Sequence, residues 1–342
     1  MGRLRQDISI YQIAQEAEVS ASTVSRVMNN RVGVGEDIRV KINKLLCKYN
    51  FTTNYPAPRR TRIAFMTAEK DQSGYISRAL KGVFEYTRPH ELDVTLIFGY
   101  DESGTVLLQR LRDQQCSAVI AGPGEWFKNI HPELAQSQLP TIFMDTIVEG
   151  PRLGYIDNDS YTGSCAAAQH LLELGHRKIG YILPFDGETV FDLRQRFQAY
   201  LDTMSQAGIA RQESWIARAL PIGDYSRGGN GIETMTQLLK QAPELTAVMA
   251  VDDGMALGAL TAIHRSGRKI PDDISLTGFD NYDDTVNWFP SLTTVNHPIE
   301  RIGYMAAEAI DQALKSPGDW VPPRLTLPTE LIIRGSTGPC IK

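Results

Sequence analysis

Apolar and polar residues alternate at helical spacing near the start of the chain. Four apolar residues stand at positions i, i+3, i+4 and i+7, on one helical face: Ile10, Ile13, Ala14 and Ala17. A second apolar set supplies a facing surface: Val19, Val24, Val27 and Met28. The pattern predicts two short amphipathic helices that are joined by a tight turn and share a small core.

The second of these helices is predicted to present polar and cationic side chains. Ser20 stands where its hydroxyl can accept a hydrogen bond from the amide of Ser22 or Thr23 as an N-cap. Ala21, Ser22 and Arg26 would then face outward. Such a set suits the major groove of DNA, where arginine bonds guanine and small residues approach base edges. The residues placed to reach phosphates are Thr23, Ser25 and Asn29.

The distribution of charge favours DNA over the alternative, a surface module that only mediates protein contacts. Residues 1–62 contain 11 lysines and arginines against 5 acidic residues, a net charge of +6. The whole chain carries −5, so the remainder carries −11. This asymmetry fits a phosphate-binding head on an acidic body that repels DNA. We therefore expect the head to be the only surface that docks on DNA.

The remainder of the chain alternates short apolar runs with helical patterns. The runs are expected to be strands, in two series: 63–66, 94–98, 118–122 and 141–144, then 179–183, 215–220, 247–251 and 275–279. Helical patterns are clearest at 161–175, 193–208 and 254–267. Because continuous apolar strands are covered on both faces, each series should form a parallel sheet between helices. The predicted fold class is α/β, with an all-α head and two doubly wound lobes.

Motifs for nucleotide, metal or redox chemistry are missing from the sequence. There is no phosphate-binding loop, the histidines form no metal-binding pair, and the four cysteines are widely spaced without a CxxC. We expect no cofactor, no metal and reduced thiols. The first seven residues are too polar for a signal peptide, and no apolar run approaches membrane-spanning length. These features favour a cytoplasmic protein with no membrane segment.

The stretch SIYQIAQEAEVSASTVSRVMNN, from Ser9 to Asn30, resembles the head of the LacI/GalR family of bacterial transcriptional regulators. The body resembles the same family in HLLELGHRKIGYI, DDGMALGAL, IPDDISLTGFDN, PSLTTVNHP and ELIIRGST. Two departures in the head are Glu18, where a turn glycine is usual, and Gly35, where the third helix usually has a serine N-cap. The resemblance implies a body similar to periplasmic sugar-binding proteins, with a ligand cleft between its lobes.

The expected domains follow from this resemblance. Residues 1–51 form the head, residues 52–62 the linker, and residues 63–342 the body that binds effector and dimerises. The first lobe comprises about 63–159 plus 291–321, and the second about 160–290 plus 322–337.

The linker departs from the family, in which a short hinge helix places a leucine in the minor groove. Arg60 occupies that leucine position here, and Pro58 lacks the amide proton for a helical bond back to Asn54. One interpretation is an extended basic arm in which Asn54 contacts DNA and Arg59, Arg60 and Arg62 follow phosphates or enter a narrow minor groove. The other is a plain linker with solvated arginines.

Residues that follow strands are the candidates for binding effector, because ligands of open parallel sheets sit beyond the carboxyl ends of the strands. Tyr75, Asp252 and Asp280 stand at such positions. The resemblance adds Arg196, from the family's Arg-x-x-Gly-Tyr pattern, and supports Asp280, from its Gly-Phe-Asp motif. It also adds two aromatic candidates, Tyr225 and Trp288. Carboxylates, an arginine and flat aromatics suit a polyol.

The resemblance implies a homodimer whose two heads bind a palindromic double-stranded operator. We expect a repressor of a carbohydrate operon. A sugar-like inducer would release it from DNA by binding better to the arrangement of the lobes in which the spacing of the two heads does not match the operator. In one alternative, the effector is a corepressor such as a purine, which strengthens binding to DNA instead of weakening it. Another is a sugar-modifying enzyme that kept a DNA-binding head, which would need an acid/base pair that the sequence does not display.

Overall fold

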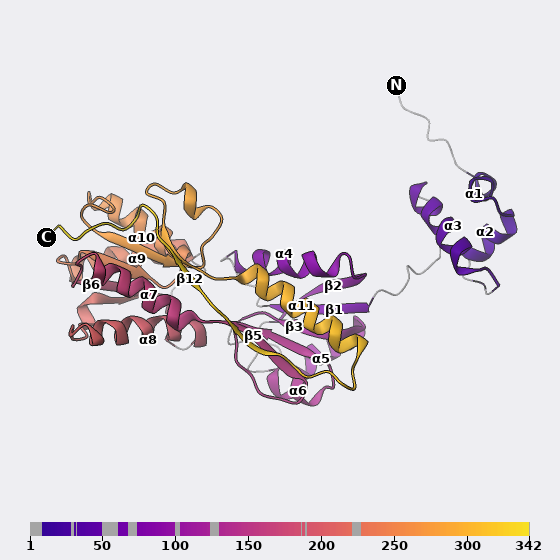
Figure 1. The fold of residues 1–342 in the computed structure, drawn as a ribbon, viewed down its shortest axis with the longest axis horizontal. Helices are drawn as coiled ribbons and strands as arrows, with labels where there is room; N and C mark the ends of the chain where they lie inside the picture. Colours follow the sequence, from indigo (N-terminus) through magenta and orange to yellow (C-terminus); the bar gives the residue numbers. More distant parts are fainter. Residues whose placement is uncertain are drawn as a thin grey trace, which may run out of the picture. The chain divides into compact units, whose positions relative to one another are not determined.

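The computed structural model describes residues 9–28, 31, 33–49, 61–67, 74–99, 103–123, 130–185, 187–188, 190–220 and 227–341 (Figure 1). The chain divides into two compact units, residues 1–60 and 61–342. We call the first unit the head and the second the body.

The described part of the head contains three helices, α1 (Ile10–Ala17), α2 (Ala21–Met28) and α3 (Glu36–Lys48). The predicted apolar faces meet in one core, to which α3 contributes Ile42 and Leu46. The predicted N-cap is confirmed, because the amide of Thr23 donates to Ser20 Oγ at 3.1 Å. Glu18 ends α1 in the left-handed region at φ 60°, a conformation that favours glycine.

The first lobe of the body is built on a six-stranded parallel sheet in the order β11-β5-β4-β3-β1-β2. Its strands are β1 (Thr61–Thr67), β2 (Leu92–Phe98), β3 (Cys116–Ala121), β4 (Thr141–Met144), β5 (Leu153–Asn158) and β11 (Arg324–Leu327). Its helices are α4 (Tyr75–Thr87), α5 (Gly104–Asp113), α6 (His131–Gln136) and α11 (Ile299–Lys315). Two apolar clusters line its sheet, one packed with α4 and α11 and the other with α5 and α6.

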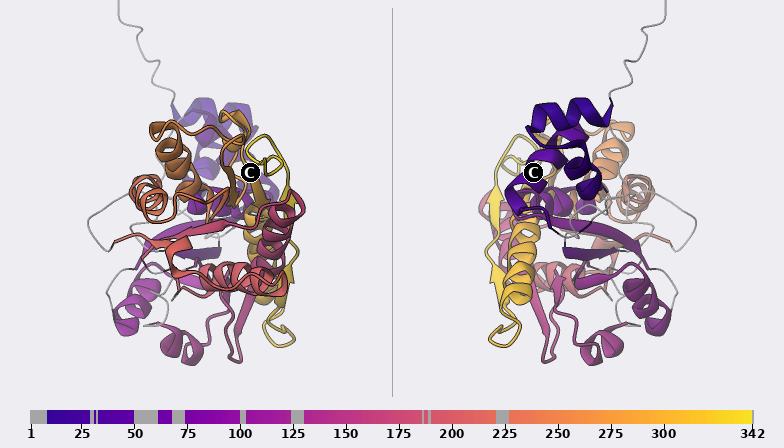
Figure 2. Two further views of the ribbon diagram at one scale, coloured as in Figure 1. Left: turned by 90° about the vertical axis from the view of Figure 1, so that its left-hand side faces the viewer. Right: turned by 90° about the vertical axis from the view of Figure 1, so that its right-hand side faces the viewer.

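The second lobe has a sheet in the order β12-β10-β9-β8-β6-β7, in which only β12 runs antiparallel to its neighbour. Its strands are β6 (Ile179–Leu183), β7 (Ile216–Arg218), β8 (Ala247–Ala250), β9 (Ser275–Phe279), β10 (Thr293–Asn296) and β12 (Glu330–Ile332). Its helices are α7 (Ser160–Glu173), α8 (Phe191–Gln206), α9 (Arg227–Gln241) and α10 (Asp253–Arg265), with short 3-10 turns at Glu213–Trp215 and Thr285–Asn287. Figure 2 shows helices on both sides of the sheets, which confirms the predicted doubly wound α/β class.

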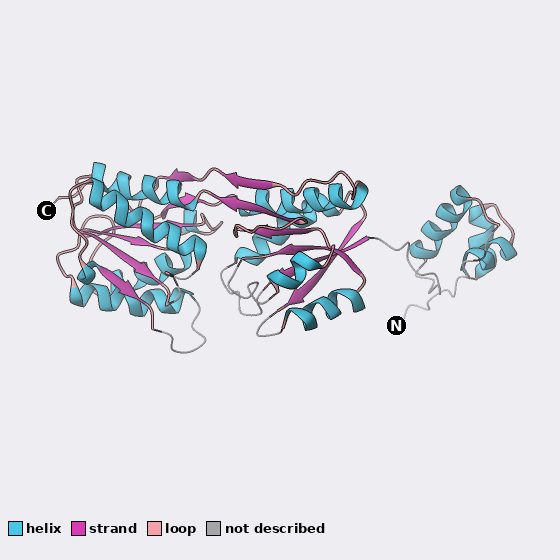
Figure 3. Cartoon of the chain, turned by 90° about the horizontal axis from the view of Figure 1, so that it is seen from below, coloured by secondary structure: helices cyan, strands magenta, loops and turns pink. Residues whose placement is uncertain are grey.

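The chain crosses between the lobes three times within residues 153–332 (Figure 3). The first crossing follows β5, which ends at Asn158. The second follows β10, which pairs with β9 in the second sheet, and the third follows β11, which pairs with β5 in the first. Each sheet therefore includes a strand from late in the chain.

Helices α4 and α11 pack closely because a glycine on each helix faces the backbone of the other helix. A Cβ on Gly82 would lie 1.8 Å from the carbonyl oxygen of Glu300, and one on Gly303 would lie 2.2 Å from that of Ala79. This contact fixes the position of α4, whose first turn carries Tyr75 and Arg78. Among the described residues, no helix has both the length and the apolar character needed to cross a bilayer.

Candidate effector site and DNA-binding surface

The outer face of α2 carries the residues predicted to read DNA. Ser22 and Arg26 are exposed, as expected, and Ser25 is half-buried. The prediction that Ala21 faces outward is wrong, because Ala21 is half-buried and packs against the core of the head. The hydroxyl of Ser20 lies 2.7 Å from Ser22 Oγ and 2.8 Å from Thr23 Oγ1, so the first turn of α2 is tied to its cap.

Four of the predicted DNA contacts lie outside the described residues: Asn29, Asn54, Arg59 and Arg60. Both interpretations of the linker therefore stay predictions.

Polar side chains from both lobes converge at the carboxyl ends of the parallel strands. Asp145 follows β4, Asn158 ends β5, Asp280 follows β9 and His297 follows β10. Asp145 and Asp280 have positive φ angles, 49° and 106°, which turn the chain sharply where each strand ends. We call the hydrogen-bonded group of Tyr75, Asp145, Asn158, Ser160, Asp192, Arg196, Asp280 and His297 the interlobe network.

Arg196 is the cationic centre of the second lobe's half of this network. Its side chain is 4% exposed and forms ion pairs with Asp192 and, at 3.3 Å, with Asp280 Oδ1. Its Nη1 donates to the carbonyl oxygen of Val251 at 3.0 Å, and its guanidinium carbon lies 3.6 Å from the centre of the Phe279 ring. Burial alone would lower the pKa of Arg196, but the neighbouring carboxylates raise it, so the side chain stays charged.

His297 joins the two lobes. Its Nε2 lies 3.1 Å from Asp145 Oδ2 in the first lobe, and its Nδ1 lies 3.2 Å from Asp280 Oδ1 in the second. Burial alone would lower the pKa of His297, but the charge of Asp145 and hydrogen bonds with both carboxylates raise it to about 9. Burial would likewise raise the pKa of Asp145, and the charge of His297 lowers it instead. The pair is therefore an imidazolium and a carboxylate near neutral pH.

Asn158 and Arg78 supply further links between the lobes. The Asn158 amide donates to Asp145 at 2.9 Å and to Asp192 at 3.4 Å. Arg78, on α4, pairs with Glu300 at 2.9 Å and donates to the backbone oxygen of Asp280 at 2.7 Å. Because both residues reach from the first lobe into the second, they hold the carboxyl ends of the two sheets together.

Among the predicted effector residues, Tyr75, Arg196 and Asp280 are brought together in this network. The Tyr75 hydroxyl donates to Asp145, and its ring centre lies 5.8 Å from that of His297. Asp252 is buried and caps α10 by accepting from the amide of Met255 at 2.8 Å, so its carboxylate has a structural task. Trp288 is half-buried against the core of the second lobe. Tyr225 lies outside the described residues.

Two further buried carboxyl groups border the network. Burial, with the charges of Asp145 and Asp192, raises the pKa of Asp157 to about 7. Burial, with the charge of Asp280, also raises the pKa of Asp253, whose oxygens accept from Thr294 Oγ1 at 2.6 Å and from the amide of Tyr282 at 2.9 Å. Because these carboxyl groups are buried and closely spaced, Asp157 can bind a proton near neutral pH.

The interlobe network contains residues that were not predicted: Asp145, Asn158, Ser160, Asp192 and His297. Asp145 follows β4, a predicted strand, so the rule that found Asp280 could have found it, whereas Asn158 ends β5, which the apolar runs did not predict. Asp192 stands one helical turn before Arg196, a spacing at which opposite charges pair. His297 follows β10, a strand that the apolar runs did not predict, and its two partners are 152 and 17 residues away in the chain.

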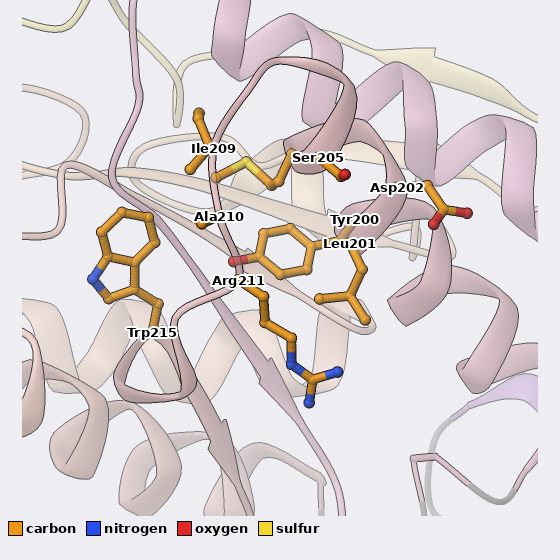
Figure 4. A pocket seen from close by; sticks show the side chains of 9 residues that line it. Tyr200, Leu201, Asp202, Ser205, Ile209, Ala210, Arg211 and Trp215 are labelled. Atoms are coloured by element: carbon orange, nitrogen blue, oxygen red, sulfur yellow. The ribbon is translucent and has the colours of Figure 1, made fainter.

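A separate surface pocket of about 240 Å³ lies on the second lobe and shares no residue with the interlobe network (Figure 4). Its lining includes Tyr200, Leu201 and Ile209 from α8 and the loop that follows, together with Arg211 and Trp215. Trp215 Nε1 donates to Glu244 at 2.8 Å, and Arg211 pairs with Glu213 at 2.5 Å. The polar groups at this rim therefore have partners of their own.

A helix-turn-helix head and a two-lobed body with polar groups between its sheets define the class of ligand-responsive DNA-binding regulators. Residues 9–54 match the family model described as bacterial regulatory proteins, lacI family, and residues 168–337 match that of a periplasmic binding protein-like domain. The chain belongs to the LacI/GalR family of bacterial transcriptional regulators.

Several known proteins are similar over nearly the whole chain. The ribose operon repressor of Haemophilus influenzae is 29% identical over 313 residues, which cover 90% of this chain and 92% of that protein. The solved complex of the transcriptional regulator CelR with cellobiose has a TM-score of 0.70 at 25% identity and covers 96% of this chain and 99% of its own. The lac repressor dimer bound to operator has a TM-score of 0.74 at 24% identity, covers 97% and 99%, and shows the shared fold.

Proposed function

We propose that this regulator is a repressor that binds a palindromic operator as a homodimer and is released by a sugar-like inducer. The observation that carries the effector half is the convergence of Tyr75, Arg196 and Asp280 at the carboxyl ends of strands from two lobes. Hydroxyl groups of a sugar donate to carboxylates and accept from a guanidinium, and an aromatic ring covers the apolar face of the sugar. The ribose operon repressor and the CelR–cellobiose complex among its relatives support a carbohydrate ligand.

The DNA half of the proposal assigns base reading to α2. Arg26 bonds guanine in the major groove, Ser22 approaches a base edge, and Ser25 reaches a phosphate. Ala21 is half-buried against the core of the head, so we assign it no base contact. The linker residues Arg59 and Arg60 add sequence-independent contacts to phosphates.

Coupling between the two sites follows from differential binding. A ligand shifts DNA affinity only if it binds one arrangement of the lobes better than the other. In our proposal the inducer replaces part of the interlobe network and thereby changes the spacing of two heads in the dimer. The family consists of transcriptional regulators, and we propose that this member acts in the cytoplasm without catalytic turnover.

The proposal is tested with the full-length protein and a panel of sugars, polyols and purines. One sugar is expected to raise the melting temperature, because a ligand that binds only the folded state stabilises it by mass action. The same sugar should weaken binding to an operator selected from a random DNA pool, measured by fluorescence anisotropy. Stabilisation by purines alone, with tighter DNA binding, would contradict the inducer assignment, and chemical conversion of the bound sugar would contradict the absence of catalysis.

Asp280→Asn provides the site-specific variant, because asparagine keeps the shape and tolerates a positive φ. It should keep operator binding and lose at least tenfold in affinity for the sugar. Asp113→Asn, on the exposed surface of α5, is the matched control and should respond as the wild type does. An Asp280→Asn protein with normal induction would remove this residue from the site.

A further inference from the structure

The interlobe network contains one group that is paired with both lobes at once. The His297 ring is 1% exposed and lies between Asp145, which belongs to the first lobe, and Asp280, which belongs to the second. Arg196 shares Asp280, and Asn158 shares Asp145. Of these side chains, His297 is the one whose free form titrates near neutral pH, with a pKa of about 6.5.

Several charged and titratable groups lie around His297. They are Tyr75 and Arg78 on α4, Asp145 after β4, Asp157 on β5 and Asp280 after β9. Arg196 on α8 pairs with the same Asp280 oxygen, and Glu300 on α11 pairs with Arg78. Arg78 contacts the backbone oxygen of His297 at 3.5 Å and is itself paired with Glu300, so its charge is compensated. The imidazole therefore faces two carboxylates directly and no uncompensated cation among these neighbours.

We propose that His297 is a proton-dependent latch that holds the two lobes closed through Asp145 and Asp280. When the lobes separate, the imidazole keeps at most one of the two carboxylates. The closed arrangement therefore binds the proton more tightly than the open one, and closure is coupled to proton uptake. The consequence for regulation rests on the proposed function: the effector meets a cleft whose opening becomes easier as the pH rises.

The sign and the pH window follow from the raised pKa. A free histidine has a pKa near 6.5, whereas the pKa of His297 in the closed arrangement is about 9. The latch is fully effective below about pH 6.5 and is lost as the pH rises through about 9. Asp157, whose raised pKa is about 7, also favours protonation in this arrangement, so its contribution must be removed separately.

The first test measures the proton on His297 in the full-length protein without effector or DNA. Histidine labelled with ¹³C at Cε1 is titrated by NMR, and the resonance absent from His297→Gln identifies the residue. We expect a pKa well above 6.5, lowered by Asp145→Asn and also by Asp280→Asn. A resonance that titrates at or below 6.5, or that responds to one carboxylate alone, overturns the latch.

The second test measures lobe separation by small-angle X-ray scattering at pH 6.5, 8 and 9.5. The wild-type protein should expand as the pH rises, and His297→Gln should be expanded at pH 6.5 already. The Asp157→Asn protein should still expand between pH 8 and 9.5, as the wild type does. His264→Gln, on the exposed surface of α10, should match the wild type at every pH. If His297→Gln fails to fold, the wild-type scan still decides, since constant dimensions from pH 6.5 to 9.5 refute the latch. Neither test contains sugar or DNA, so failure here is distinct from failure of the proposed function.

Discussion

At the scale of single residues, the candidate effector site is a set of buried charges that satisfy one another. Arg196 has two carboxylates, a backbone oxygen and an aromatic ring around one guanidinium. Removing one partner from such a group leaves an uncompensated buried charge, which costs about 3–5 kcal/mol. An effector must therefore replace these contacts with equivalent ones, and this requirement selects ligands rich in hydroxyl groups.

Arg26 is the residue whose loss should separate the two halves of the protein. Arg26→Ala is expected to reduce specific operator binding by about 30-fold or more, since a bidentate contact with guanine is worth about 1–3 kcal/mol in each of two heads. Sugar-induced stabilisation of the body should be unchanged. Lys44→Ala, which removes the same charge from α3, should cost less, and fluorescence anisotropy with specific and random DNA distinguishes the two. Equal losses for both variants would count against base reading by Arg26.

Asp157 should make the stability of the body depend on pH. Its pKa is raised to about 7 in the folded state, so its favourable contribution is present at low pH and disappears as the pH rises through 7. Asp157→Asn should therefore raise the melting temperature at pH 8 by about 3 °C or more and change it little at pH 4. Calorimetry at both values checks this, and a larger effect at pH 4 would reverse the assigned sign.

At the scale of elements, the apolar runs predicted most of the strands and the amphipathic faces predicted the head. The runs at 141–144, 179–183 and 275–279 coincide with β4, β6 and β9. The sequence LGYIDN of β5 was not recognised, because its polar end belongs to the interlobe network rather than to the sheet interior. β11 and β12 are short and contain no buried residue, so they lack the apolar run that marks a central strand.

The candidate site was only partly predictable for a related reason. Asp280 and Tyr75 follow predicted strands and could be found by position, whereas His297 follows β10, which the apolar runs did not predict, and its partners lie on two different lobes. Asp252 shows that a carboxylate after a strand can also cap the next helix. Local patterns place residues at the edge of a sheet, but tertiary contacts decide which of them meet.

The close packing of α4 against α11 gives a prediction at this scale. Gly82→Ala should destabilise the body by about 1–3 kcal/mol or more, because the added methyl group would collide with the backbone of Glu300. Gly318→Ala is the control, since a Cβ there meets nothing within 4 Å. Chemical denaturation of both variants checks the difference. Equal stability of the two proteins would mean that the helices separate without cost.

At the scale of the whole molecule, charge is divided between the basic N-terminal segment and the acidic remainder. The +6 of residues 1–62 and the −11 of the rest make the head the surface that phosphates approach. Operator affinity should therefore fall steeply with salt, by roughly 10³-fold or more between 50 and 200 mM if six or more phosphates are contacted. Anisotropy titrations across this range measure the slope, and a flat response would contradict phosphate docking by the head.

The late strands also constrain the order in which the molecule can be completed during synthesis. The first sheet is complete only when β11 at 324–327 has been synthesised, after nearly all of the second lobe. β12 completes the second sheet a few residues later. Neither lobe corresponds to a continuous fragment, so a nascent chain halted near residue 290 would expose the unfinished edges of both sheets to chaperones. Translation of residues 291–332 then completes both lobes almost together.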